Sequence, residues 1–149
     1  MSDDLPIHDL APMGDGVHQS ERGRIYVDRA LPGDIVRAKI QRAGGVLRGD
    51  PTRIIQASPH RVKAPCPHYD VCGGCSLQHA EDAFYKSWKA DVVRRVLDRK
   101  GLAPEVWRPP VFLPGGQRRR VTFAATKKKN GVTLGYFRRR THVVADVAG

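Results

Sequence analysis

The sequence predicts a mainly β protein of the α+β class, in which one helix separates two β regions. Short apolar and alternating runs, broken by turn residues, fill residues 7–58 and are typical of several short strands. Apolar residues at four-residue spacing within 81–100 indicate the helix. Asn130-Gly131, a strong signal for a two-residue hairpin turn, indicates a second β region near the end of the chain.

The first β region is expected to hold five short strands. The clearest ones are residues 7–10, 24–27, 35–40 and 52–57. A turn is predicted at Leu31-Pro32-Gly33-Asp34, because proline fixes φ and glycine accepts a positive φ. Further interruptions are expected at Gly44-Gly45 and at Gly49-Asp50-Pro51. So many short strands favour a small closed barrel, since closure removes exposed strand edges.

All three cysteines of the chain, Cys66, Cys72 and Cys75, lie within one short loop. Cysteines that ligate a metal or cluster lie close together because several sulfurs must reach one centre. Gly73 and Gly74 allow a tight turn between the last two sulfurs. The spacing therefore predicts a metal or cluster site on these three cysteines.

The residues alone leave other interpretations of the cysteines open. Three thiols can form one disulfide and one free thiol, although an odd count without a signal segment argues against a secreted disulfide scaffold. Cys-x2-Cys is also a common zinc half-site, which would take a fourth ligand such as His68 or His79. Iron–sulfur, zinc and no metal are the three alternatives.

The predicted helix has an apolar stripe and charged ends. Glu81 and Asp82 favour its positive N-terminal end, and Arg99-Lys100-Gly101 is a fitting C-terminal end. Its stripe comprises Phe84, Trp88, Val92 and Val96, with Val93 and Leu97 beside them. We expect Phe84 and Trp88 to pack in a core rather than to stack on bases.

Positive charge is concentrated in the last third of the chain. The net charge is +11, and between Glu105 and Asp146 there are ten basic residues and no acidic one. Three strands are expected there, at 118–126, 132–137 and 141–147, with a turn at 127–131. Such a basic β region predicts a polyanionic partner such as a nucleic acid, although a solvated face without a partner is the alternative.

Aromatic side chains accompany these basic triplets. Tyr136 and Phe137 can stack on an unpaired base, and in an alternating strand only one of them faces outward. The predicted RNA contacts are Arg118, Arg119, Arg120, Lys127, Lys128, Lys129, Tyr136, Arg138, Arg139 and Arg140. Charge alone does not distinguish RNA from DNA.

Membrane and secretory functions are not indicated. No apolar run approaches the ~20 residues that span a bilayer, and the acidic N-terminus lacks a signal segment. We expect a cytoplasmic protein with no membrane partner, and the sequence indicates no protein partner.

The run Cys-x5-Cys-Gly-Gly-Cys-x2-Gln-His, at residues 66–79, resembles the iron–sulfur motif of the bacterial RNA uridine-5-methyltransferases. The 23S ribosomal RNA (uracil-5-)-methyltransferases are the branch most similar to it. Residues 1–58 resemble a TRAM domain, an OB-like barrel that binds RNA, through Gly14-Asp15-Gly16, residues 23–27 and the turn at 31–34. The basic hairpin resembles the start of the central RNA-binding domain of that family.

The resemblance implies the N-terminal portion of such an enzyme: a TRAM-like barrel at 1–58, an iron–sulfur loop and helix at 59–101, and the start of an RNA-binding β domain at 102–149. It implies a [4Fe–4S] cluster on Cys66, Cys72 and Cys75, with a fourth ligand beyond Gly149. It also implies S-adenosylmethionine as methyl donor in the full-length enzyme and structured ribosomal RNA as partner.

The chain alone is expected to be inactive. It shows no glycine-rich strand–loop–helix for the methyl donor and no further cysteine to serve as nucleophile. Two other functions stay open at this point: a stand-alone RNA-binding module and a zinc-dependent nucleic-acid-binding protein. A barrel that serves only as a spacer is the alternative for residues 1–58.

Overall fold

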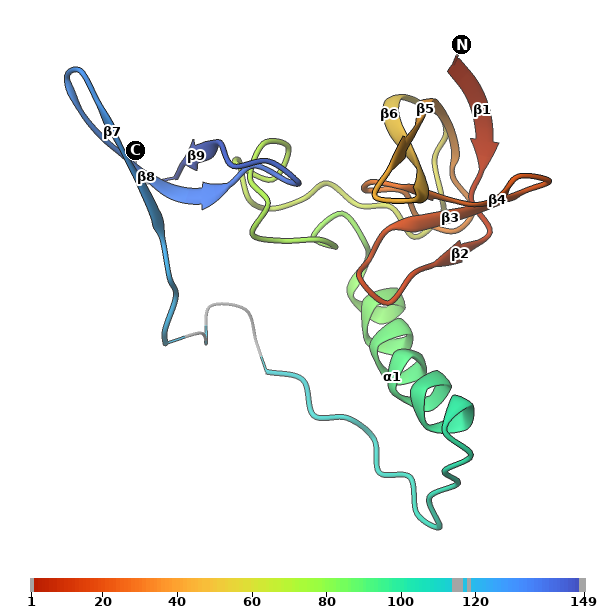
Figure 1. Cartoon of the computed structure of the whole chain (residues 1–149). Helices are drawn as coiled ribbons and strands as arrows, with labels where there is room; N and C mark the ends of the chain where they lie inside the picture. Colours follow the sequence, from red (N-terminus) through yellow and green to blue (C-terminus); the bar gives the residue numbers. More distant parts are fainter. Residues whose placement is uncertain (1, 114–116, 118, 148–149) are drawn as a thin grey trace. The chain divides into compact units, whose positions relative to one another are not determined.

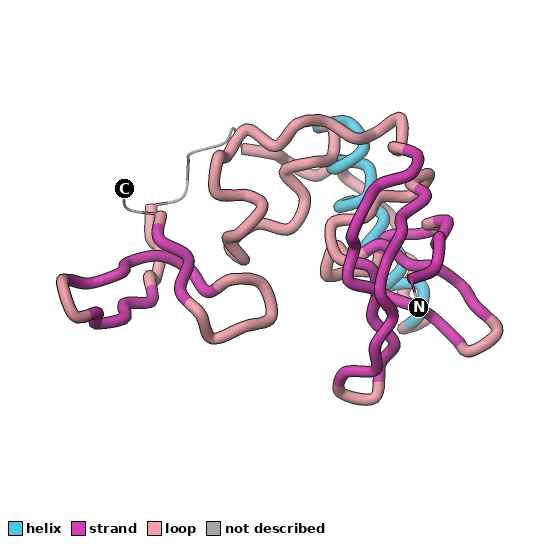
Figure 2. The backbone as a smooth tube through the Cα atoms, turned by 90° about the horizontal axis from the view of Figure 1, so that it is seen from above, coloured by secondary structure: helices cyan, strands magenta, loops and turns pink. Residues whose placement is uncertain are grey.

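The structure is a computed structural model that describes residues 2–113, 117 and 119–147. The described elements are β1 (Ser2–Pro6), β2 (Asp9–Leu10), β3 (Gly16–Ser20), β4 (Gly23–Val27), β5 (Ile35–Ala43), β6 (Val46–Gln56), α1 (Asp82–Arg99), β7 (Ala124–Lys128), β8 (Gly131–Phe137) and β9 (Val144–Asp146). The described residues form one helix and nine strands, which confirms the mainly β class. Figure 2 shows the strands in magenta and the helix in cyan. Within the described residues, no helix is long and apolar enough to cross a membrane.

The chain divides into two compact units. The first unit comprises residues 1–63 and 76–84, and the second comprises 64–75 and 85–149. The predicted segment 59–101 is therefore shared between both units. The cysteine loop, which carries Cys66, Cys72 and Cys75, belongs to the second unit. The strands β7, β8 and β9 of the basic region belong to the same unit.

The sheet of the first unit has the strand order β1-β5-β6-β4-β3-β2. Neighbouring strands are antiparallel, except that β4 and β6 are parallel. The two strands at the ends of this order, β1 and β2, follow each other directly in the chain, so the sheet curls back toward its own start (Figure 1). Its buried core comprises Leu5, Ile7, Ile25, Val27, Ala30, Val36 and Ala38.

The strands β5 and β6 run further than the sequence predicted. An interruption was expected at Gly49-Asp50-Pro51, but β6 continues through it. Glycine is favoured at position 49 because an added Cβ would lie 3.1 Å from Val27 and 3.2 Å from Ala38 in the core, which is tighter than an ordinary contact. Pro51 pairs with Ala38 at a register irregularity, where a residue without an N–H is tolerated in a strand.

The turn at 31–34 is tied into the first unit by one buried carboxylate. Asp34 accepts the backbone N–H groups of Leu31 and Ser58, both at 2.7 Å. The guanidinium of Arg61 donates to the same carboxylate. Gly33 adopts φ +90°, which glycine accepts without strain. The turn that carries much of the TRAM resemblance is thus a structural joint.

The helix α1 matches its prediction to within one residue at each end. Trp88 is its one buried residue among those described, as expected for a core contact. The half-buried Phe84 stacks on His60 with ring centroids 4.7 Å apart. The rest of the apolar stripe is less covered, since Val93 and Val96 are 50% and 42% exposed.

The sheet of the second unit is antiparallel with the order β7-β8-β9. The strand expected at 118–126 begins only at Ala124, and residues 119–123 lie outside it. Lys127 and Lys128 were predicted in the turn but end β7 instead. The pairing of Lys128 with Gly131 leaves Lys129-Asn130 as a two-residue turn.

Candidate nucleic-acid interface and cysteine loop

The cysteine loop is folded by its own backbone hydrogen bonds. The N–H of Tyr69 donates to the carbonyl of Cys66 at 3.2 Å, and the N–H of Cys72 donates to the carbonyl of His68 at 2.8 Å. Tyr69 and Cys72 are buried, Cys75 is exposed, and Cys66 is intermediate. None of the three cysteines forms a disulfide, so all three retain thiols.

These thiols fit a metal or cluster by chemistry but not yet by arrangement. The N–H of Gly74 donates to Sγ of Cys72 at 3.3 Å, a contact of the kind that tunes cluster sulfurs. Within the described residues, however, no group of three or more His, Cys, Asp or Glu side chains is placed to hold a metal ion. The zinc alternative with His68 or His79 meets the same finding.

The cysteine loop packs against the C-terminal end of β8. The N–H of Gly73 donates to the carbonyl of Phe137 at 2.9 Å, and Cys72 forms an antiparallel bridge with Arg138. In Figure 1 the loop lies beside β8 and β9. The predicted ligands and one of the basic triplets therefore share a backbone contact, although they are far apart in sequence.

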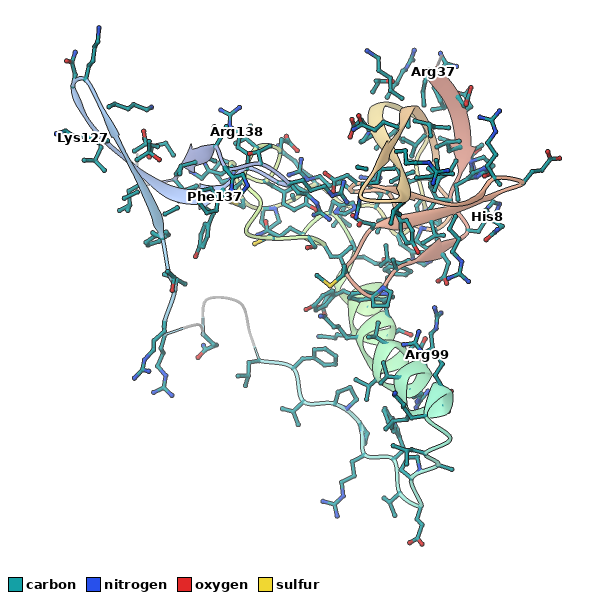
Figure 3. The ribbon with its side chains drawn as sticks, viewed as in Figure 1. His8, Arg37, Arg99, Lys127, Phe137 and Arg138 are labelled. Atoms are coloured by element: carbon teal, nitrogen blue, oxygen red, sulfur yellow. The ribbon has the colours of Figure 1, made fainter. Side chains whose placement is uncertain are left out.

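Two basic triplets lie at opposite ends of β8. Lys127, Lys128 and Lys129 are exposed at the tip of the β7–β8 hairpin, and Arg138 begins the loop between β8 and β9. Figure 3 labels Lys127 and Arg138 at these two ends. At a rise of about 3.4 Å per residue, β8 separates them by roughly 20 Å. The triplets flank a strand rather than forming one compact patch.

The loop that carries Arg138, Arg139 and Arg140 has a defined backbone. The N–H of Arg138 donates to the carbonyl of Val143 at 2.7 Å, and the N–H of Thr141 donates to the carbonyl of Arg138 at 3.1 Å. Arg140 adopts φ +57°, a left-handed conformation that costs a non-glycine residue about 1 kcal/mol. Arg138 and Arg140 are exposed, and Arg139 is half-buried.

Arg119 and Arg120 of the third basic triplet border a hollow in the second unit. Arg119 and Arg120 are exposed, whereas Arg118 lies outside the described residues. The hollow has a volume of about 710 Å³ and is lined by Arg119, Arg120, Val121, Thr122 and Tyr136. Two arginines and one tyrosine therefore line the same open hollow.

The two neighbouring aromatic residues of β8 have different surroundings. Tyr136 is half-buried, with its ring 5.1 Å from that of Phe123, and a Cβ added to Gly74 would lie 3.2 Å from it. Phe137 is 48% exposed. The sequence left the outward residue open, and Phe137, absent from the predicted contacts, is the more accessible of the two. The alternation of side chains along a strand had predicted that only one of these two residues faces outward.

The excess charge of the chain resides in the second unit. The first unit holds ten basic and ten acidic residues, a net charge of zero. The second holds sixteen basic and five acidic residues, a net charge of +11. Attraction to a polyanion is therefore a property of the unit that contains the cysteine loop and the sheet β7-β8-β9.

No family model matches the chain. The curated proteins similar to it are named RNA methyltransferases. One from Caulobacter vibrioides is 41% identical over 141 residues, covering 93% of this chain and 33% of the relative. One from Rhizobium meliloti is 37% identical over 149 residues, covering 96% of this chain and 35% of the relative. The chain thus spans about a third of the length of these relatives.

A solved structure is similar in fold to the whole chain. It is the tRNA (uracil-54, C5)-methyltransferase of Pyrococcus abyssi in complex with S-adenosyl-L-homocysteine. The TM-score is 0.63 at 26% identity, covering 100% of this chain and 32% of that one. The resemblance inferred from the sequence is confirmed: the chain is related along nearly its whole length to RNA methyltransferases, and its structural neighbour is a uracil C5-methyltransferase.

Proposed function

We propose that residues 1–149 are the N-terminal, RNA-recognising part of an S-adenosylmethionine-dependent RNA uridine C5-methyltransferase. The observation that carries this proposal is the net charge of +11 in one unit of a chain related to RNA methyltransferases. The proposed substrate is structured RNA, as 23S ribosomal RNA in the cytoplasm. Methyl transfer belongs to a catalytic domain outside these residues.

The second unit supplies the proposed RNA contacts. Phosphates would bind the basic triplets at both ends of β8, and an unpaired base would stack on an aromatic ring of that strand. The hollow beside Tyr136 offers Arg119 and Arg120 to a phosphate near that base. Guanidinium and ammonium groups bind phosphate without reading sequence, so these contacts provide affinity and register.

The first unit is proposed to be the TRAM domain. The support for this assignment is a curled sheet whose end strands, β1 and β2, follow each other in the chain, together with the resemblance of residues 1–58 to a TRAM domain. Its zero net charge makes it a weak electrostatic partner for RNA. We assign it a supporting role in RNA binding, through shape or through spacing, rather than the main affinity.

The cysteine loop is proposed to bind a [4Fe–4S] cluster. Cys66, Cys72 and Cys75 would supply three of its ligands, and a different residue would supply the fourth. The cluster would stabilise the folded state of the cysteine loop. The reason is that the ligands come together only in the folded protein, so the free energy of ligation adds to the free energy of folding. The described residues show no assembled group of metal ligands, so the proposal is supported by the chemistry and the close spacing of the three thiols.

Metal content and thermal unfolding test the cluster. Anaerobic reconstitution with iron and sulfide should raise the unfolding midpoint of the unaltered protein and leave that of Cys72→Ser unchanged. Bound zinc without acid-labile sulfide would favour the zinc alternative. An equal rise in both proteins would show that the metal acts elsewhere.

The salt dependence of RNA binding tests the function. Replacing Lys127, Lys128 and Lys129 by glutamine should make the salt dependence of binding shallower. The magnitude of the negative slope of log K against log salt should fall by about 2, since each phosphate contact on a single strand contributes about 0.7. Replacing Arg138, Arg139 and Arg140 should do the same. The matched control replaces three exposed cations of the first unit, Arg22, Lys39 and Arg53, and should change little. Equal losses in all three variants would refute a localised interface.

A further inference from the structure

Gly73 contacts the base of the arginine loop, which is the loop between β8 and β9 that carries Arg138, Arg139 and Arg140. Its N–H donates to the carbonyl of Phe137 at 2.9 Å, the last residue of β8 before Arg138. The preceding residue, Cys72, bridges to Arg138 itself. Two successive residues of the cysteine loop therefore contact the backbone where the arginine loop leaves the sheet.

The contact at Gly73 is too close for any side chain. An added Cβ would lie 2.6 Å from the carbonyl oxygen of Phe137 and 3.0 Å from the backbone nitrogen of Arg139. Both are main-chain atoms held by the sheet and its loop, so they cannot rotate away as a side chain would. The neighbouring Gly74 differs, because its added Cβ would meet the ring of Tyr136 at 3.2 Å. A ring can shift by a few tenths of an ångström.

The arginine loop has a fixed shape of its own, which makes its direction depend on its base. The hydroxyl of Thr141 donates to the carbonyl of Arg138 at 3.2 Å and accepts the N–H of Val143 at 3.1 Å. These bonds constrain the backbone of residues 138–143. Where it leaves β8 is therefore the point that determines the direction of all three arginines.

We propose that Gly73 is a positioning residue for RNA binding: its close backbone contact orients the loop of Arg138, Arg139 and Arg140 toward the RNA backbone. This rests on the proposed function, in which these arginines bind phosphate. Gly73 itself touches no RNA in this proposal. The cysteine loop thereby supports and orients a phosphate-binding loop, in addition to binding any metal.

A matched pair of variants in the otherwise unaltered protein tests the role. The probe is a fluorescein-labelled RNA stem-loop, with binding followed by anisotropy across a salt series. Gly73→Ala should weaken binding about tenfold and lower the salt slope by up to about 2, as expected when up to three phosphate contacts are lost. The control is Gly101→Ala, whose added Cβ meets nothing within 4 Å, and it should stay within about threefold with an unchanged slope. Equal behaviour of the two variants would overturn the proposal.

A double-mutant cycle separates positioning from general damage. In a protein with Arg138, Arg139 and Arg140 all replaced by glutamine, Gly73→Ala should cause no further loss of RNA affinity. A further loss of similar size would mean that Gly73 acts through something other than the arginines. If the triple replacement itself leaves binding unchanged, the proposed function fails at this loop, which is a different result from failure of the positioning role.

Hydrogen exchange tests the proposal without a substitution at Gly73. The amide of Gly73 should be protected, and RNA should increase its protection, because coupling between two contacts is reciprocal. That increase should disappear in the triple glutamine variant. Free exchange of this amide, or protection indifferent to RNA, would overturn the proposal even if Gly73→Ala failed to fold.

Discussion

Asp34 shows how a single side chain can hold a turn, a strand end and a following loop together. Its side chain is fully buried, and the paired Arg61 side chain is only 18% exposed. The second amino group of Arg61 also donates to the carbonyl of Arg29 at 2.8 Å. A buried carboxylate is tolerated in this way because charge and hydrogen bonds compensate for its lost hydration.

Asp34→Asn should destabilise the protein by about 3 kcal/mol, because it leaves the Arg61 guanidinium without its buried counter-charge. Urea unfolding of the two proteins measures the difference. The control is Asp4→Asn, which removes an exposed carboxylate paired with Arg37 and should leave the urea midpoint almost unchanged. Equal midpoints for all three proteins would contradict the role assigned to Asp34.

Asp4 itself provides a pH-dependent prediction. Arg37 donates two hydrogen bonds to its carboxylate, at 2.7 and 2.8 Å, and these bonds lower the pKa of Asp4 below its usual range. A depressed pKa means that the small stabilisation is present above the unfolded-state pKa and is lost as the pH falls through the folded-state pKa. Carboxyl NMR titration should show the low pKa, and Arg37→Gln should raise the pKa of Asp4 back to the usual range of an aspartate.

At the scale of elements, the sheet β7-β8-β9 depends on one close backbone approach. A Cβ added to Gly135 would lie 1.9 Å from the carbonyl oxygen of Ala145, so β8 and β9 can pair only if this position has no side chain. Ala145 is buried at the same place. The glycine therefore permits the third strand, which in turn closes the loop that carries Arg138–Arg140.

Gly135→Ala should separate β9 from β8 and cost about 3 kcal/mol, at the upper end of the range for overpacking. Hydrogen exchange of the β9 amides should speed up, and the free energy of unfolding should fall. Gly131→Ala is the control: it adds a methyl group in open space at φ +140° and should cost about 1 kcal/mol without exposing β9. Retained protection of β9 in Gly135→Ala would show that the strands can move apart locally.

At the scale of the whole molecule, the distribution of charge and the length of the chain indicate which part binds RNA. One unit is electrically neutral and the other carries the entire excess charge, while the chain spans about a third of its relatives. We therefore expect electrostatic attraction to a polyanion to come mainly from the second unit. The chemistry of methyl transfer is proposed to lie in the two thirds of those relatives that this chain does not match.

Residues 1–149 should bind RNA yet transfer no methyl group to it. Incubation with RNA and tritiated S-adenosylmethionine, followed by nucleoside separation, should show no 5-methyluridine above background. The positive control is a relative of full length under the same conditions. Detectable 5-methyluridine from residues 1–149 would mean that this chain contains a methyl-donor site, against the proposed division of labour.

The sequence by itself determined the mainly β class, the helix, the presence of a hairpin around Asn130 and the resemblance to RNA methyltransferases. Those features are local, since they depend on periodicity, turn residues and motif spacing along a short stretch of chain. Only the tertiary structure decided that β6 continues through Gly49 and Pro51 and that the basic triplets stand at opposite ends of β8. It also decided that Gly73 meets the base of the arginine loop. Strand pairing and close packing join residues far apart in sequence, so no local pattern specifies them.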